Sequence, residues 1–311
     1  MSVKSKFSKK LILIAGPTAS GKSKLAIQVA KKINGEIINA DSMQIYKEFS
    51  ILSSRPSNLD VKKIKHHLYG FLSVKKYFSV GDWLALVKKN VEKINKKKKV
   101  PIIVGGTGLY FKAITQGIGK IPNIDTKVRK KIRELHKKIG QDAFYKKLIS
   151  IDEKSKNYIS PKDTQRTLRA YEVKLTTKKS LYDWFSNTRS DFLDYDIKKF
   201  YLDTPREILL KNIEKRTNQM FKRDCIKEVS HFLDLKIDKS LSSNKLIGVN
   251  EISRYLSGFC NLDNVRELIN IRTRQYAKRQ NTWSRGHMKL WKRVFFKDLI
   301  NLNKIVLKEI S

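Results

Sequence analysis

The first 120 residues contain short apolar runs that alternate with helical patterns. Residues 11–14 read Leu-Ile-Leu-Ile, a continuous apolar run typical of a strand buried on both faces. After it, apolar side chains recur at helical spacing from Leu25 to Ile33. Residues 36–40 read as a second strand and residues 100–104 as a third. Strands that alternate with helices predict parallel pairing through crossover helices, and therefore a doubly wound α/β core.

The pattern changes near residue 121, where helical periodicity with many basic side chains replaces the buried-strand runs. Another strand is expected at 198–203, after which the chain reads as largely helical to its end. We therefore predict a core formed by residues 1–120 and 200–311, with residues 121–199 as an inserted helical domain.

Charge narrows the choice of partner. The chain of 311 residues has 67 Lys and Arg against 29 Asp and Glu, a formal net charge of +38. A polyanionic partner explains this excess, because basic side chains that neutralise phosphates release condensed counterions. A general lysine bias is the alternative, but it accounts less well for the scarcity of acidic residues. Residues 127–147 contain nine Lys and Arg and two acidic residues, which suits either a phosphate-facing surface or a solvated helix.

Other features limit the compartment. No apolar run approaches the ~20 residues that cross a bilayer, and the apolar stretch at 11–15 is too short for a signal peptide. Cys225 and Cys260 are far apart and lack metal-ligand spacing, so neither a disulfide framework nor a zinc site is expected. We expect a cytoplasmic monomer that has no membrane partner.

The strongest motif is a phosphate-binding loop between the first strand and the first helix. Residues 16–23 fit G-x-x-x-x-G-K-[ST], and a strand precedes and a helix follows them. Such a loop wraps backbone N–H groups around phosphate oxygens, with a lysine for charge and a hydroxyl for Mg²⁺. The predicted phosphate ligands here are Gly16, Pro17, Thr18, Ala19, Ser20, Gly21, Lys22 and Ser23, with Ser23 also as the metal ligand. The loop alone does not tell which phosphate compound it binds.

Two more strand ends carry polar residues. Asp41 follows the strand at 36–40, where open α/β sheets place functional groups, although a helix cap or a magnesium ligand would occupy the same position. The strand at 100–104 ends in Gly-Gly-Thr-Gly-Leu-Tyr and has no acidic residue there, which weakens the case for an ordinary ATPase. Thr107 in this segment is either a helix cap or a diphosphate ligand.

Together with 16–23, the segments 41–46, 105–110, 165–166 and 278–283 resemble the bacterial tRNA dimethylallyltransferase family in order and spacing. The resemblance runs through nearly the whole chain. It implies a P-loop NTPase-like fold with an inserted helical tRNA-binding domain. It also implies transfer of a dimethylallyl group from dimethylallyl diphosphate, with Mg²⁺, to the exocyclic N6 amine of the adenosine 3′ of the anticodon. The tRNAs concerned would be those that read codons beginning with U.

The resemblance also implies roles for individual residues. Asp41 becomes the general base for the amine, Thr107 lies beside the reacting centre, and Arg216 contacts the diphosphate. For each of these the ordinary reading of a surface or capping side chain remains open. The implied contacts to the anticodon stem-loop are Asp41, Ser42, Met43, Gln44, Thr107, Arg129, Gln165, Arg166, Thr167, Leu168, Arg169, Lys245, Lys278 and Arg279.

Two segments depart from the family pattern. Residues 245–250 read Lys-Leu-Ile-Gly-Val-Asn where the family has Gly-Tyr and a basic residue, and no glycine occurs in 221–225. Two other functions stay open on the residues alone. An ATP-dependent nucleoside or RNA kinase would use the same loop, and a non-catalytic RNA-binding protein would keep the charge without the chemistry.

Overall fold

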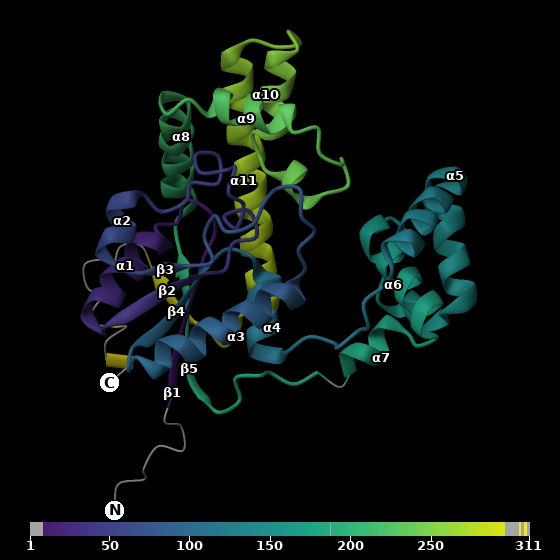
Figure 1. Cartoon of the computed structure of the whole chain (residues 1–311), viewed down its shortest axis with the longest axis horizontal. Helices are drawn as coiled ribbons and strands as arrows, with labels where there is room; N and C mark the ends of the chain where they lie inside the picture. Colours follow the sequence, from purple (N-terminus) through teal and green to yellow (C-terminus); the bar gives the residue numbers. More distant parts are fainter. Residues whose placement is uncertain (1–8, 187, 296–304, 306–307, 310–311) are drawn as a thin grey trace, which may run out of the picture. The chain divides into compact units, whose positions relative to one another are not determined.

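The structure is a computed structural model that describes residues 9–186, 188–295, 305 and 308–309. The chain forms two compact units, one from residues 1–114 with 192–311 and the other from residues 115–191. Figure 1 shows the second unit as a group of teal helices, α5 to α7. Within the described ranges, no helix combines the length and the apolar character that a membrane span needs.

The first unit contains a six-stranded parallel sheet with the order β3-β2-β4-β1-β5-β6. This confirms the doubly wound parallel sheet predicted from the apolar runs. Strand β5 already includes residues 195–199, which the predicted insertion 121–199 contained. The strand bounds are β1 Lys9–Ala15, β2 Gly35–Asn39, β3 His66–His67, β4 Val100–Gly105, β5 Tyr195–Asp203 and β6 Lys292–Phe295.

The two edge strands were not predicted. Strand β3 pairs only two residues with β2, and β6 pairs four residues with β5. The chain after β5 is largely helical, as expected, but residues 292–295 form a strand that was not predicted. Segments this short have no diagnostic period, so pairing with a neighbour that is already in the sheet defines them.

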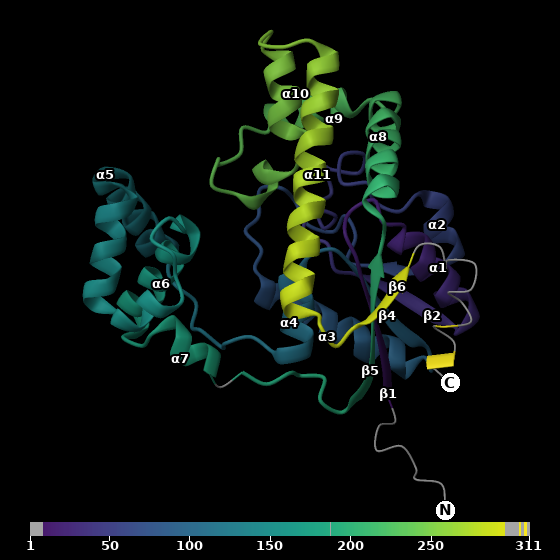
Figure 2. The ribbon, with the colours of Figure 1, turned by 180° about the vertical axis from the view of Figure 1, so that it is seen from behind.

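Helices cover both faces of the sheet. Helix α1 (Lys22–Lys32) packs Leu25 and Val29 against one face, where Ile12 and Ile102 project from β1 and β4. Helix α3 (Val80–Lys96) contacts β2 and β4, and α4 (Gly108–Gln116) follows β4. Figures 1 and 2 show α1 on one side of the strands and α3 and α4 on the other.

A second hydrophobic cluster joins the C-terminal helices to the segment after β2. It contains side chains from α8 (Arg206–Lys222), α9 (Cys225–Asp234), α10 (Val249–Leu256) and α11 (Leu262–His287), and from residues 45–74. The Glu228 carboxylate reinforces this packing by accepting hydrogen bonds from the backbone N–H groups of residues 50–52, at 2.6–2.8 Å. These contacts hold the 41–55 loop, which carries Asp41, against the helices. Two short elements, α2 (Asn58–Lys63) and η2 (Ser242–Lys245), complete this unit.

The second unit is helical and has its own core. Helix α5 (Thr126–Ile151) bends at Gly140, whose φ of 79° suits a residue without a side chain. It packs on α6 (Thr164–Thr177) and, through η1 (Glu153–Asn157), reaches α7 (Leu181–Ser186). Ile132, Phe144, Leu148 and Tyr171 are buried between these helices.

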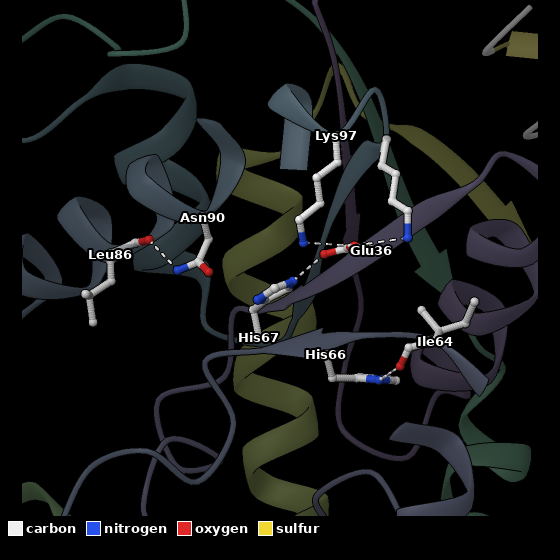
Figure 3. Close-up of polar contacts among 8 residues, drawn as sticks. Glu36, Ile64, His66, His67, Leu86, Asn90 and Lys97 are labelled. Carbon is white, nitrogen blue, oxygen red and sulfur yellow. Dashed lines mark hydrogen bonds and ion pairs between the residues drawn. The ribbon is translucent and has the colours of Figure 1, made fainter. Parts of the chain in front are cut away.

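A charged cluster lies at the β3 edge of the sheet, around Glu36 of β2 (Figure 3). Glu36 is 1% exposed, and its carboxylate contacts His67 Nε2 at 2.7 Å and the Lys99 and Lys97 ammonium groups at 3.1 and 3.5 Å. Burial raises the pKa of Glu36, but the hydrogen bonds from His67 and Lys99 and the charges of Lys97 and His67 together outweigh it, so the net pKa is lowered. The carboxylate is thus ionised and paired, which a buried charge requires.

Candidate active site

Three loops meet at the carboxyl edge of the sheet. Ala15 at the end of β1 lies in register with Gly105 of β4 and with Tyr201 of β5, and Asn39 of β2 pairs with Val104. The chain order reverses between β1 and β4, which makes this the topological switch point where open α/β sheets bind ligands. The phosphate-binding loop, Asp41 and Thr107 therefore converge, as parallel pairing requires.

The loop at 16–23 has the conformation that a phosphate cradle needs. Gly21 has a φ of 89° and Ala19 a φ of 63°, so the chain makes left-handed steps before α1 begins. The Lys22 ammonium lies within the loop and donates to the Pro17 carbonyl at 3.0 Å. Burial lowers the pKa of Lys22 to about 8, and the charge of Asp41 opposes that effect while Arg216 adds to it.

Two side chains of helix α8 hold this loop. Arg216 Nη1 donates to Thr18 Oγ1 at 2.7 Å, and Asn212 Nδ2 donates to the Ala19 carbonyl at 3.0 Å. Burial lowers the pKa of Arg216, and the negative charge of Asp41 opposes that shift. Among the described side chains, Arg216 Nε and Ser20 Oγ are buried polar atoms that lack a hydrogen-bond partner. Two half-buried cations and two buried polar atoms without a partner thus lie beside the loop, an arrangement that suits an anion.

Gln280 on α11 connects two of the loops. Its Oε1 accepts from the Thr18 N–H at 2.8 Å, while its Nε2 donates to the Gly106 carbonyl at 2.9 Å. One amide therefore holds the phosphate-binding loop and the β4–α4 loop at a set separation. A β-carbon on Gly106 would lie 2.2 Å from Gln280 Nε2, which explains why that position has no side chain.

Asp41 is held by its own loop. Its N–H donates to Asn39 Oδ1 at 2.8 Å, and its Oδ1 accepts from the Met43 N–H at 2.9 Å. Thr107 Oγ1 accepts from the Ser42 N–H at 3.0 Å, which places the threonine hydroxyl one residue from Asp41. Only one carboxylate oxygen of Asp41 is used by the turn, so the other can accept a proton from a ligand.

The charge of Asp41 affects the pKa of several neighbouring side chains. Burial raises the pKa of Tyr69, of Tyr110 and of Tyr276, and the Asp41 charge raises each pKa further. The carboxylate therefore lies among neutral phenols and the cations of Lys22 and Arg216.

A cavity of about 200 Å³ opens between these loops and α11. Gly16 and Thr107 line one part of it, and four aromatic side chains line it together with Arg279 and Gln280 of α11. A β-carbon on Gly108 would lie 2.4 Å from the Trp283 ring, so the glycine allows the close approach of that ring. The aromatic side chains in the lining are Phe111, Tyr201, Tyr276 and Trp283.

The sequence-predicted tRNA contacts of the first unit differ in exposure. Asp41, Ser42, Met43 and Gln44 are half-buried, and the Gln44 amide already donates to the carbonyls of Ser53 and Ser54. By contrast, Lys245 on η2 and the pair Lys278 and Arg279 on α11 are exposed.

In the second unit, the predicted contacts lie on α5 and α6. Gln165 and Arg166 are exposed, whereas Thr167 is fully buried and donates to the Asp163 carbonyl at 2.7 Å. Leu168 packs against the core of the unit. Arg129 and Arg169 both approach the buried carboxylate of Glu172, at 3.7 and 3.5 Å. The exposed side chains of Gln165 and Arg166 are thus directly accessible to a large ligand, while Arg129 also serves the packing of α5 on α6.

Sequence reasoning assigned no role to Gln280, Asn212, Tyr276 or Trp283. Gln280 and Trp283 stood within a segment that resembles the family, which was the only signal available for them. Asn212 and Tyr276 lie at ordinary helical positions, and only the folded chain brings them to the loops.

The segment without a glycine at 221–225 has a simple structural solution. Asp224 adopts the left-handed conformation, with a φ of 64° and a ψ of 47°, where a glycine would be favoured. In the other departing segment, Gly248 has a φ of 106° and immediately precedes α10, so the glycine itself retains a backbone role.

Known proteins identify this arrangement. Residues 44–287 match the sequence model of the IPP transferase family. The chain is 54% identical over 285 residues to a tRNA dimethylallyltransferase of Pelagibacter ubique. The aligned region covers 92% of this chain and 91% of the relative. A tRNA dimethylallyltransferase of Rickettsia felis is 40% identical over 276 residues, or 88% of this chain and 89% of the relative.

Solved structures agree. The crystal structure of a tRNA isopentenylpyrophosphate transferase from Staphylococcus epidermidis has a TM-score of 0.68 and 31% identity, and the match covers 97% of this chain and 99% of that one. A eukaryotic dimethylallyltransferase acting on tRNA has a TM-score of 0.74 and 28% identity, over 89% of this chain and 70% of that one. The family match, the identities and the shared P-loop fold together show that this chain belongs to the IPP transferase family, the tRNA dimethylallyltransferases.

Proposed function

We propose that this tRNA-prenylating enzyme uses dimethylallyl diphosphate as its donor and the N6 amine of the adenosine 3′ of the anticodon as its acceptor, in tRNAs that read codons beginning with U. The observation that carries the proposal is the aromatic-lined cavity that joins Gly16 of the phosphate-binding loop to Thr107. A five-carbon apolar chain attached to a diphosphate matches a site that is cationic at one end and aromatic beyond it.

The diphosphate would be bound by the loop and its supports. Lys22 and Arg216 supply positive charge, and the unpartnered Ser20 Oγ and Arg216 Nε supply further donors. Because charge accumulates on the diphosphate as the allylic C–O bond breaks, these groups stabilise the transition state more than the ground state.

The acceptor amine needs a base, since its lone pair is delocalised into the adenine ring. Asp41 is positioned for this role because one carboxylate oxygen remains available beyond its turn. In the reaction, the amine nitrogen forms a bond to the allylic carbon, the C–O bond to diphosphate breaks, and the amine proton passes to Asp41. The Thr107 hydroxyl, which is held by the Ser42 N–H, helps to orient the reacting groups.

Magnesium fits the site through the diphosphate. Ser23 lies exposed in the first turn of α1, directly after Lys22, where a loop hydroxyl meets a metal bound to phosphate. When bound, Mg²⁺ would neutralise charge on the leaving diphosphate. Among the described residues no group of three or more His, Cys, Asp and Glu side chains could hold a metal, so most of its ligands would be phosphate oxygens and waters.

The acceptor tRNA fits the charge of the chain. An adenosine in the anticodon loop can leave its stack at lower cost than one in a duplex, and so can reach an enclosed site. We further propose that the exposed Lys245, Lys278 and Arg279 bind its phosphates, together with Gln165 and Arg166 of the inserted domain.

Mass spectrometry of tRNA after incubation with the purified chain, dimethylallyl diphosphate and Mg²⁺ tests the donor and the acceptor together. The expected product gains one C5H8 unit on the adenosine 3′ of the anticodon. Phosphorylated RNA with ATP, without a mass gain from the prenyl donor, would reject the proposal. RNA binding without any product would point instead to a non-catalytic protein.

A further inference from the structure

A pair of stacked tyrosines lies on the surface of the second unit, and neither is explained by the site described above. Tyr158 and Tyr182 stack with ring centroids 4.0 Å apart and an interplanar angle of 16°. Phe185 meets the Tyr182 ring edge-on at 6.1 Å. Tyr158 is 54% exposed and Phe185 is 46% exposed. These three rings form an aromatic platform.

Buried polar contacts fix the platform. Asp152 is 4% exposed, and its Oδ2 accepts from Ser155 Oγ at 2.7 Å and from Ser180 Oγ at 3.0 Å. Ser155 precedes Tyr158 in the same turn, and Ser180 Oγ accepts from the Tyr182 N–H at 3.3 Å. One buried carboxylate therefore ties together the two segments that carry the stacked rings. A surface that is ordered before a ligand arrives loses little entropy on binding.

A cavity of about 720 Å³ adjoins the exposed ring of Tyr158. Ile149 and Ile159 form apolar parts of its lining, and Tyr145 Oη donates to the Ile159 carbonyl at 3.0 Å, which holds that loop. Lys146, Lys156 and the Asn157 amide also line the cavity. The site thus combines an aromatic surface, two ammonium groups and one amide capable of pairing with a base edge.

The charge of the unit selects one class of partner. Residues 115–191 contain 19 Lys and Arg against nine Asp and Glu. An aromatic ring beside basic side chains is the arrangement by which proteins hold unpaired nucleotides, because every base has a face that stacks and every nucleotide a phosphate. An apolar partner would leave the ammonium groups of Lys146 and Lys156 unpaired. An acidic partner would pair with them but leave the aromatic rings uncovered.

We infer that the cavity beside Tyr158 binds an unpaired nucleotide of the tRNA substrate, other than the acceptor adenosine. Its base stacks on the Tyr158 ring and its phosphate lies between Lys146 and Lys156. This inference rests on the proposed function for its RNA partner. It assigns the inserted domain a stacking contact in addition to its phosphate contacts.

The test is tRNA binding by the full chain in the absence of prenyl donor, with 2-aminopurine placed in turn at the unpaired positions of the anticodon stem-loop. We expect Tyr158→Ala to raise the Kd by roughly 5- to 100-fold, as loss of one stacked base does. Tyr158→Phe should keep the Kd within about twofold, because the ring alone stacks. One labelled position should be quenched by wild type and by Tyr158→Phe, and not by Tyr158→Ala.

Controls separate stacking from folding. Phe259→Ala removes a ring that is 76% exposed in the other unit, and it should leave the Kd unchanged. The paired Lys146→Ala and Lys156→Ala substitutions change exposed side chains, and together they should reduce the salt slope of log K by about 0.7 per lost phosphate contact. That variant keeps the test decisive if Tyr158→Ala fails to fold.

Wild-type affinity and quenching in Tyr158→Ala, or an unchanged salt slope in the lysine variant, would overturn the inference. Its failure is distinguishable from failure of the proposed function. Wild-type chain that prenylates tRNA while Tyr158→Ala binds normally contradicts only the platform. Wild-type chain that shows the platform effects on binding but adds no prenyl group contradicts only the proposed reaction.

Discussion

Replacing Asp41 with Asn isolates proton acceptance at the active site. The Asp41 Oδ1 atom accepts from the Met43 N–H at 2.9 Å, and an asparagine Oδ1 can keep that bond. The turn also keeps the hydrogen bonds between residues 39 and 41, since one is made by the backbone N–H and the other by the backbone carbonyl of residue 41. The substitution therefore changes the second oxygen into an amide group while the loop stays in place.

The expected magnitude follows from these contacts. Loss of a positioned base should lower the single-turnover rate by about 10²- to 10⁴-fold, which is roughly 3–5 kcal/mol in the activation barrier. Asp41→Ala also removes the bond to the Met43 N–H, worth about 1 kcal/mol, so it should be slower again by roughly fivefold. Donor affinity should stay close to wild type in the asparagine variant.

The assay must keep Lys22 charged. The Asp41 charge helps to hold the pKa of Lys22 near 8 against burial, so removing that charge lowers the pKa of the lysine. Single-turnover rates are therefore best measured at pH 6.5 with saturating tRNA, across a magnesium titration. Lys22→Ala is the control, because loss of the loop cation should impair donor binding and turnover together.

A magnesium-independent rate defect with normal donor binding supports the general base. Recovery of the Asp41→Asn rate at high Mg²⁺ would refute that reasoning and make Asp41 a metal ligand. A rate within about threefold of wild type would show that another group takes the proton.

Three further results are expected. Gln280→Ala removes the hydrogen bonds to the Thr18 N–H and the Gly106 carbonyl, so kcat/KM for the donor should fall by about 5- to 30-fold. An unchanged kcat/KM would show that the link between the two loops through Gln280 is dispensable. Gly108→Ala places a β-carbon 2.4 Å from the Trp283 ring, so it should either cost about 1–3 kcal/mol of stability or displace the ring with loss of turnover. Thermal unfolding and turnover assays measure these two effects. Gly286→Ala, where nothing lies within 4 Å of the added carbon, should show neither effect. Burial lowers the pKa of His66 and the pKa of His67 below the ordinary 6.5, so the unfolded chain binds more protons than the folded chain as pH falls. The free energy of unfolding should therefore decrease below pH 6.5, which denaturant titrations between pH 7.5 and 5.5 measure. A double His66→Asn, His67→Gln variant with the same pH dependence would contradict this assignment.

Local pattern was enough to predict much of the core. The strand patterns at 11–14, 36–40 and 100–104 became β1, β2 and β4, because strands covered on both faces are rich in apolar side chains. The buried Glu36 and Asn39 are exceptions in β2, and their polar groups are paired within the fold. The phosphate-binding loop could be predicted because its glycines, lysine and serine lie within eight consecutive residues, 16–23. Asp41 and Thr107 followed from the rule that parallel strands end at a shared edge.

The rest depended on contacts between distant parts of the chain. Strand β6 is defined by its pairing with β5. Four residues are too few to show the alternation of apolar and polar side chains that predicts a strand. The platform at Tyr158 likewise depends on Asp152 joining two segments that are separate in sequence.

The sequence by itself determined the class of fold, the phosphate-binding loop and the residues that follow β2 and β4. Only the tertiary structure decided what completes the site. Gln280 reaches the Thr18 N–H across 262 positions, and Asn212 reaches the Ala19 carbonyl across 193. An isolated helix shows the spacing of its apolar face but not which loop its polar face will meet, because that choice is made when α8 and α11 pack beside the sheet.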